Sequence, residues 1–212
     1  MQALERTCIF GVGLLAIWLC AAPATRVSAA GSEIREYQGG KLSPFDRDYD
    51  NSIKGPQKID IKVYRLVVTG LVGRPLSLTY QEVLNLPHVQ RVVNMPCVEG
   101  WDERVLYEGV LLSDIFALAQ PKPGAAHAAF FAADGYSSAL PLKYLQESKA
   151  LLGFTINGLV LDEKRGFPFQ VVAEKKLGYK WVKWVTRIDL KDKPYLGYWE
   201  QRGYDDKADT NR

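Results

Sequence analysis

The apolar segments beyond residue 58 of this 212-residue chain are short, and glycine or proline ends most of them. Apolar spacing and composition predict strands over 59–69, 89–95, 128–133, 151–156, 169–173 and 181–190. Short helices are predicted after Thr79, whose pairing with Glu82 forms a capping box, after Ser113, and over 141–147. Because strands outnumber helices and do not alternate with them, the sequence predicts an α+β fold with mixed β-sheets.

Residues 1–30 have the pattern of an export signal. The stretch from Cys8 to Ala22 runs fifteen residues without a charge, and Ser28-Ala29-Ala30 fits a signal cleavage site. This run is shorter than the about 20 residues of a spanning helix, although an uncleaved anchor remains the alternative. Arg6 stands alone, so the twin-arginine pair is missing. We expect a periplasmic or extracellular protein.

The rest of the chain is expected to form an extended arm over 31–58, one domain over 59–204 and a polar tail over 205–212. The 27 basic and 24 acidic residues give a net charge of +3 without a clustered basic stripe, so we expect no nucleic-acid partner. Two of the three cysteines lie in the leader. The exported chain would therefore keep a single thiol, Cys97, which cannot form an internal disulfide.

Cys97 lies in the stretch Met95-Pro96-Cys97-Val98-Glu99-Gly100-Trp101, directly after a predicted strand. Loops at strand ends often display reactive groups, but a lone cysteine is also a common buried apolar residue. Only two histidines are present, without H-E-x-x-H, paired C-x-x-C or a phosphate loop, so a zinc site is not expected.

A second unusual stretch, 177–184, places lysines between aromatic residues. Ammonium groups bind phosphate and aromatic rings enclose a flat heterocycle, so the stretch could hold an anionic planar ligand. The alternative is a half-buried strand with solvated lysines, in which Val182 and Trp184 share one face and Trp181 and Lys183 the other.

Five motifs follow one another in a fixed order. They are Cys97–Trp101, Asp134-Gly135-Tyr136 with Leu140-Pro141-Leu142, Asn157-Gly158, Gly166-Phe167-Pro168, and Gly178–Trp184. The series resembles the molybdopterin-binding domain of the sulfite oxidase family over about residues 58–204. Glu99 and Trp101 make the cysteine loop more similar to the protein-methionine-sulfoxide reductase branch.

This resemblance implies a molybdenum held by a pterin dithiolene and by the thiolate of Cys97, a soft ligand suited to such a metal. It implies that Glu99 and Trp101 shape the pocket and that Tyr204 faces the metal. The implied cofactor contacts are Asn51, Ser52, Asp134, Arg165, Gln170, Lys180, Trp181, Val182 and Lys183. Among them, Lys180, Lys183 and Arg165 are expected to neutralise the phosphate.

The function implied is an exported molybdenum-cofactor oxidoreductase that transfers an oxygen atom in a two-electron step, similar to a sulfoxide reductase. Its substrate would be a small molecule, a sulfoxide or an oxyanion, its electron partner a membrane or c-type cytochrome, and its state a monomer. Two positions depart from the family, which commonly has His or Asn at Arg165 and Arg at Gln170. With the missing twin-arginine pair, they leave a second hypothesis, a cofactor-less binding module of the same fold.

Overall fold

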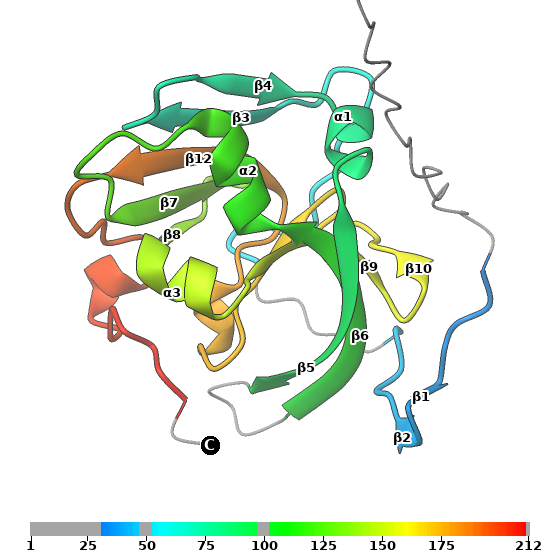
Figure 1. Ribbon diagram of the computed structural model, residues 1–212. Helices are drawn as coiled ribbons and strands as arrows, with labels where there is room; N and C mark the ends of the chain where they lie inside the picture. The colour runs from blue at the N-terminus through cyan, green and yellow to red at the C-terminus, as the bar shows by residue number, and fades with distance from the viewer. Residues whose placement is uncertain (1–30, 47–51, 97–101, 211–212) are drawn as a thin grey trace, which may run out of the picture.

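The computed structural model describes residues 31–46, 52–96 and 102–210, which form two five-stranded sheets and short helices (Figure 1). The first sheet has the order β10-β9-β6-β5, with β11 also paired to β9, and all its pairs are antiparallel. Its strands are β5 (His88–Pro96), β6 (Asp102–Leu111), β9 (Leu151–Ile156), β10 (Leu159–Val160) and β11 (Gln170–Val172).

The second sheet has the order β4-β3-β12-β7-β8. Its strands are β3 (Leu66–Gly70), β4 (Leu76–Leu78), β7 (His127–Ala132), β8 (Ser137–Pro141) and β12 (Val185–Lys191). Because β12 runs parallel to β3 and antiparallel to β7, this sheet is mixed. The predicted α+β class with mixed sheets is therefore confirmed.

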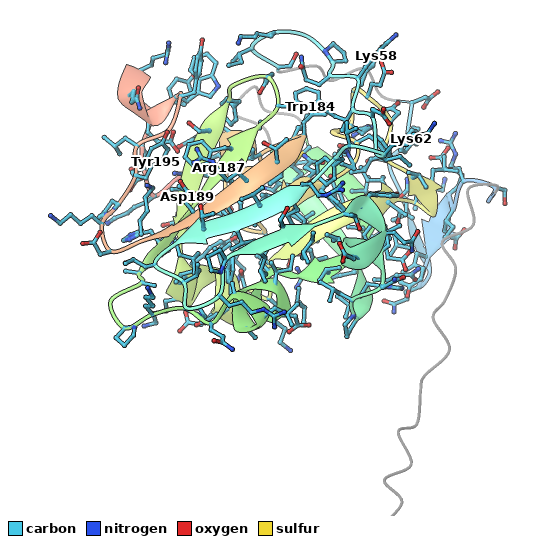
Figure 2. The ribbon with its side chains drawn as sticks, turned by 90° about the horizontal axis from the view of Figure 1, so that it is seen from above. Lys58, Lys62, Trp184, Arg187, Asp189 and Tyr195 are labelled. Atoms are coloured by element: carbon cyan, nitrogen blue, oxygen red, sulfur yellow. The ribbon has the colours of Figure 1, made fainter. Side chains whose placement is uncertain are left out.

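One continuous hydrophobic core joins the two sheets and the helices α1 (Tyr80–Leu84), α2 (Leu112–Ala119) and α3 (Leu142–Glu147). In β12, Ile188 and Leu190 enter this core, whereas Arg187 is exposed and lies with Asp189 on the opposite face. Figure 2 shows Trp184 near the start of this strand and Arg187 and Asp189 further along it.

The capping box is confirmed, because Thr79 Oγ1 accepts from the Glu82 N–H and the Glu82 carboxylate accepts from the Thr79 N–H. The turn at Asn157-Gly158 is also confirmed between β9 and β10, with positive φ angles of 52° and 78°. The cap expected at Ser113 is wrong, since α2 begins at Leu112 and its N-cap residue is Leu111.

Two strand predictions need correction. The strand expected over 59–69 begins only at Leu66, because the Asp60 carbonyl accepts from the N–H groups of Val63 and Tyr64 and closes a turn there. The strand expected over 181–190 begins at Val185, since Trp184 has a φ of 49° and its N–H donates to a loop. Before it lies a 3-10 turn, η1 (Gly178–Lys180).

Residues 34–43 run along the first sheet and form the hairpin β1 (Glu36–Tyr37) with β2 (Gly40–Lys41). The Ile34 N–H donates to the Asn157 carbonyl, and the Ser43 N–H donates to the Arg104 carbonyl. At the other end, a second 3-10 turn, η2 (Glu200–Arg202), precedes residues that return to Lys175–Leu177. Within the described ranges, no helix is long and apolar enough to cross a membrane.

Candidate cofactor site

The irregular segment 181–184 is where several loops meet. Ala133 donates its N–H to the Trp184 carbonyl at 3.0 Å, and the Trp184 N–H donates to the Gly166 carbonyl at 3.3 Å. The Val171 N–H donates to the Val182 carbonyl at 2.8 Å. Three expected site residues are direct chain neighbours of these contacts: Asp134, Arg165 and Gln170. The fold therefore gathers them around Trp181–Lys183.

Asp134 lies in the turn between β7 and β8 and is 2% exposed. Its Oδ1 accepts from the Tyr136 N–H at 2.8 Å, which closes the turn. Its Oδ2 is buried and has no hydrogen-bond partner among the described residues. An unsatisfied buried acceptor costs about 1–3 kcal/mol, so the position suits a ligand that brings an N–H donor.

The end of the N-terminal arm reaches the same turn. A Cβ added at Gly135 would lie 3.4 Å from the Nζ of Lys54. Two residues before Lys54, the hydroxyl of Ser52 is buried. Ser52 is thus two residues from Lys54, which lies beside the Asp134 turn. This position is compatible with the cofactor contact expected of Ser52.

Arg165 is 6% exposed and pairs with Glu103, which is fully buried at the start of β6. Its guanidinium also donates to the carbonyl of Phe45 at 2.9 Å through Nη2. Burial by itself would lower the pKa of Arg165, but the hydrogen bond to Glu103 and its negative charge outweigh that effect and raise the pKa. This guanidinium is therefore a permanent cation whose contacts lie within the protein.

Gln170 is the first residue of β11 and is 4% exposed. Its Oε1 accepts from the Tyr107 hydroxyl at 2.9 Å, and its Nε2 lies 3.5 Å from the Trp181 carbonyl. Burial raises the pKa of Tyr107, so the phenol stays protonated and acts as the donor. Gln170 therefore links the start of the 181–184 segment to β6.

The two lysines of the segment have different surroundings. Lys180 is fully buried, and its Nζ bonds to Glu200 Oε1 at 2.6 Å, to Asp206 Oδ1 at 3.1 Å and to the Ala139 carbonyl at 3.1 Å. An ammonium has three donors, so these contacts use all of them. Lys183 is partly exposed, and its Nζ donates to the Lys164 carbonyl at 2.7 Å.

Tyr204 follows η2 and is 42% exposed. Its ring packs edge-on against Tyr179 at 5.2 Å between ring centroids and lies tilted against Trp199 at 5.0 Å. Burial, followed by the charge of Asp205, raises the pKa of Tyr179 to about 12. The Tyr179 hydroxyl donates to the carbonyl of Asp205, the residue after Tyr204. This hydrogen bond and the ring contact together hold Tyr179 and Tyr204 side by side.

Four expected site residues fall outside the described residues: Asn51, Cys97, Glu99 and Trp101. β5 ends at Pro96 and β6 begins at Asp102, and these two residues are register partners in the sheet. Within residues 31–46, 52–96 and 102–210, no group of three or more His, Cys, Asp or Glu residues could hold a metal ion.

Sequence reasoning missed the buried partners Glu103, Tyr107 and Glu200. Glu103, Val105 and Tyr107 occupy every second position of β6, but Leu106 between them is buried too, so no alternation marks this face. Glu200 has no local signal either, because it lies in a single 3-10 turn.

Residues 53–199 match the family described as the oxidoreductase molybdopterin binding domain, so the chain belongs to this family. It is 30% identical over 155 residues to an uncharacterized oxidoreductase, YuiH, of Bacillus subtilis, covering 73% of this chain and 78% of that protein. It is also 30% identical over 162 residues to the putative protein-methionine-sulfoxide reductase subunit YedZ1 of Azospira oryzae, covering 76% and 61%.

Among solved structures, the sulfane dehydrogenase SoxCD of Paracoccus pantotrophus superposes with a TM-score of 0.68 at 24% identity. The match covers 84% of this chain and 50% of that chain, and it supports the sulfite-oxidase-like fold. The protein is therefore a molybdenum-cofactor-dependent oxidoreductase, and molybdenum–molybdopterin is its cofactor. Family membership thus favours the enzyme over the cofactor-less module.

Proposed function

We propose that this oxidoreductase is exported and transfers an oxygen atom between a sulfur-containing substrate and its cofactor in a two-electron step. Two relatives are named for protein-methionine-sulfoxide reduction, and one of them is 31% identical over 147 residues. We therefore take a sulfoxide as the substrate class. Its reduction consumes two electrons and two protons and yields a thioether and water.

The observation that carries the proposal is the buried, unpartnered Oδ2 of Asp134 beside the 181–184 segment. In this assignment, Asp134 accepts an N–H of the pterin, and Ser52 with Asn51 contacts it from the arm. Trp181, Val182 and Lys183 bind the phosphate. When bound, the molybdenum cofactor supplies the two-electron redox chemistry, and the chain's own residues orient it and exclude water.

Lys183 is the cation best suited to the phosphate, because its side chain is partly exposed whereas Lys180 is fully buried. The charged groups of Lys180 and Arg165 are bound to the carboxylates of Glu200 and Glu103. These contacts support a role for Lys180 and Arg165 in orienting the pocket rather than in binding the phosphate directly. Gln170 acts in the same way through the Trp181 carbonyl.

We assign the metal-binding thiolate to Cys97 and the pocket walls to Glu99 and Trp101, as the sequence motif implies. Tyr204 would donate a hydrogen bond to the oxygen of the substrate. Export would follow from residues 1–30, and electrons would come from a membrane or c-type cytochrome to a monomeric enzyme. These parts of the proposal rest on the sequence pattern.

The test compares wild-type protein from its native host with Cys97→Ser. We expect about one molybdenum per wild-type chain and reduction of peptide methionine sulfoxide with an artificial electron donor. Cys97→Ser should lower that activity by more than about 100-fold while its circular dichroism spectrum stays unchanged. Retained activity in Cys97→Ser would refute the ligand assignment, and wild-type oxidation of sulfite without sulfoxide reduction would refute the substrate class.

A further inference from the structure

A buried ion pair connects the two chain segments next to the site. Lys180 is the last residue of η1, and Glu200 is the first residue of η2. Both side chains have 0% relative exposure, and Nζ lies 2.6 Å from Oε1. A buried ion pair is often no more stabilising than apolar residues of similar volume, so stability alone does not explain it.

Both partners are also bound to β8, which gives the pair a fixed base. Lys180 Nζ donates to the Ala139 carbonyl at 3.1 Å, and Ser138 Oγ donates to Glu200 Oε1 at 2.5 Å. The chain at Gly197 also approaches β8 closely. A Cβ added at Gly197 would lie 2.1 Å from the Ser137 carbonyl oxygen. Segments 178–180 and 197–200 are therefore both held against one strand.

Each partner lies beside a residue that the proposed function uses. Lys180 directly precedes Trp181–Lys183, the segment to which the cofactor phosphate is assigned. Glu200 lies four residues before Tyr204. The ring of Tyr204 packs on Tyr179, the neighbour of Lys180. The ion pair thus fixes the phosphate segment and the substrate tyrosine relative to each other.

We propose that Lys180 and Glu200 are positioning residues, which set Tyr204 at a fixed place relative to the cofactor-binding segment. This inference rests on the proposed function. It predicts that the pair affects cofactor retention and turnover beyond its effect on stability.

The chain offers a matched control in the pair Lys176–Asp209. Lys176 is also buried, with a side-chain exposure of 8%, and its Nζ lies 2.5 Å from Asp209 Oδ1. This pair binds the C-terminal residues to the stretch before η1, outside the 178–204 region. Loss of either lysine removes a buried cation from a carboxylate, which is fully buried at Glu200 and 61% exposed at Asp209, and only Lys180 lies between the two site segments.

The experiment uses the full chain, loaded in a host that makes the cofactor, as wild type, Lys180→Met, Lys180→Met/Glu200→Leu and Lys176→Met. Urea unfolding gives stability, and molybdenum content after dialysis gives cofactor retention. Near-ultraviolet circular dichroism of the cofactor-free protein reports the packing of its aromatic rings, and the spectrum of Tyr204→Phe identifies the part that comes from Tyr204 and its neighbours Tyr179 and Trp199. Tyr204→Phe, alone and with Lys180→Met, shows whether the two residues act together on kcat.

We expect Lys180→Met to lose molybdenum about tenfold faster than Lys176→Met and to lower kcat about tenfold more than it changes KM. The apolar double variant should regain stability but not cofactor retention or the aromatic signal. The kcat effects of Lys180→Met and Tyr204→Phe should be less than additive, since one acts through the other.

The inference is overturned if the apolar double variant regains stability, molybdenum retention and aromatic signal together, because the pair would then be structural only. It is also overturned if Lys176→Met matches Lys180→Met in every readout. A wild-type protein that holds molybdenum but reduces no sulfoxide would refute the proposed function instead. In that case the retention and aromatic signals still decide the role of the pair.

Discussion

Arg165 and Glu103 are joined by a hydrogen bond from Nη1 to Oε2 at 2.8 Å and by an ion-pair contact of 2.8 Å between Nη2 and Oε1. The Nε and Nη2 groups of Arg165 also donate to the Phe45 carbonyl at 3.2 and 2.9 Å. The guanidinium therefore connects the N-terminal arm with the first residues of β6, while the backbone N–H of Arg165 donates to Asp162 Oδ1 at 2.7 Å. The pair is nearly inaccessible to water.

Removing one partner of this pair should be strongly destabilising. Arg165→Met leaves the carboxylate of Glu103 buried and uncompensated, so we expect a loss of about 3–5 kcal/mol in the free energy of unfolding. The double variant Arg165→Met/Glu103→Leu should recover most of that loss, apart from the contacts to Phe45. Urea unfolding monitored by circular dichroism measures both, and a double variant less stable than Arg165→Met contradicts the prediction.

Tyr144 gives the stability a specific dependence on alkaline pH. Burial raises the pKa of its phenol to about 12, with the Ser148 hydrogen bond lowering it and the charge of Glu174 adding to the rise. Between about pH 10 and pH 12 the unfolded chain loses this proton and the folded chain keeps it. Stability should therefore fall as the pH rises through this window. A difference of one whole proton between the two states would give about 1.4 kcal/mol per pH unit, and the fall should be smaller because solvent reaches part of this side chain.

Tyr144→Phe should separate this effect from the hydrogen bond that the phenol donates to the Glu174 carbonyl. At neutral pH, where both states keep the proton, the variant should be less stable by about 1 kcal/mol. Above pH 10 its stability should fall less steeply than that of wild type. Parallel curves of unfolding free energy from pH 8 to pH 12 would show that Tyr144 does not contribute.

Local sequence signals predicted the elements whose geometry depends on a few neighbouring residues. The capping box at Thr79 and Glu82 and the turn at Asn157-Gly158 are of this kind. The strand over Asp102–Leu111 was missed, because Val105, Leu106 and Tyr107 are all buried and the usual alternation is absent. The alternation of residue types over 181–190 predicted a strand that begins too early. Contacts from distant loops hold Trp184 out of the sheet, so β12 begins at Val185.

The candidate site shows the same limit. The order of motifs pointed to Asp134, Gln170 and 180–183, and the fold brings them to one region. The carboxylates of Glu103 and Glu200 could not be predicted, because charged residues are normally exposed and nothing local indicates a partner 20 or 62 residues away. Buried ion pairs depend on tertiary structure that a local pattern does not contain.

Gly197 should be intolerant of a side chain because of its approach to β8. The added methyl group of Gly197→Ala would meet the Ser137 carbonyl and the Ser138 Cα at 2.1 and 2.6 Å. We expect a loss of about 1–3 kcal/mol in stability and faster release of molybdenum, as 197–204 moves from the strand. Gly178→Ala is the control, since nothing lies within 4 Å of its added Cβ, and equal melting temperatures for the two variants would contradict the prediction.

Asp134→Asn separates the turn from the cofactor contact. Asparagine keeps an oxygen for the Tyr136 N–H but replaces the unpartnered Oδ2 with an amide that donates. The fold should therefore keep its stability, whereas a pterin N–H would face another donor. One unsatisfied contact costs about 1–3 kcal/mol, so cofactor affinity should fall by roughly 5- to 150-fold.

Molybdenum content after dialysis and urea unfolding of the same preparations measure the two effects separately. Asp192→Asn, at an exposed position after β12, removes the same charge and should change neither quantity. Asp134→Asn with wild-type molybdenum content would show that Oδ2 does not accept from the pterin. A large loss of stability would assign Asp134 to the turn alone, because the amide oxygen would then have failed to replace Oδ1.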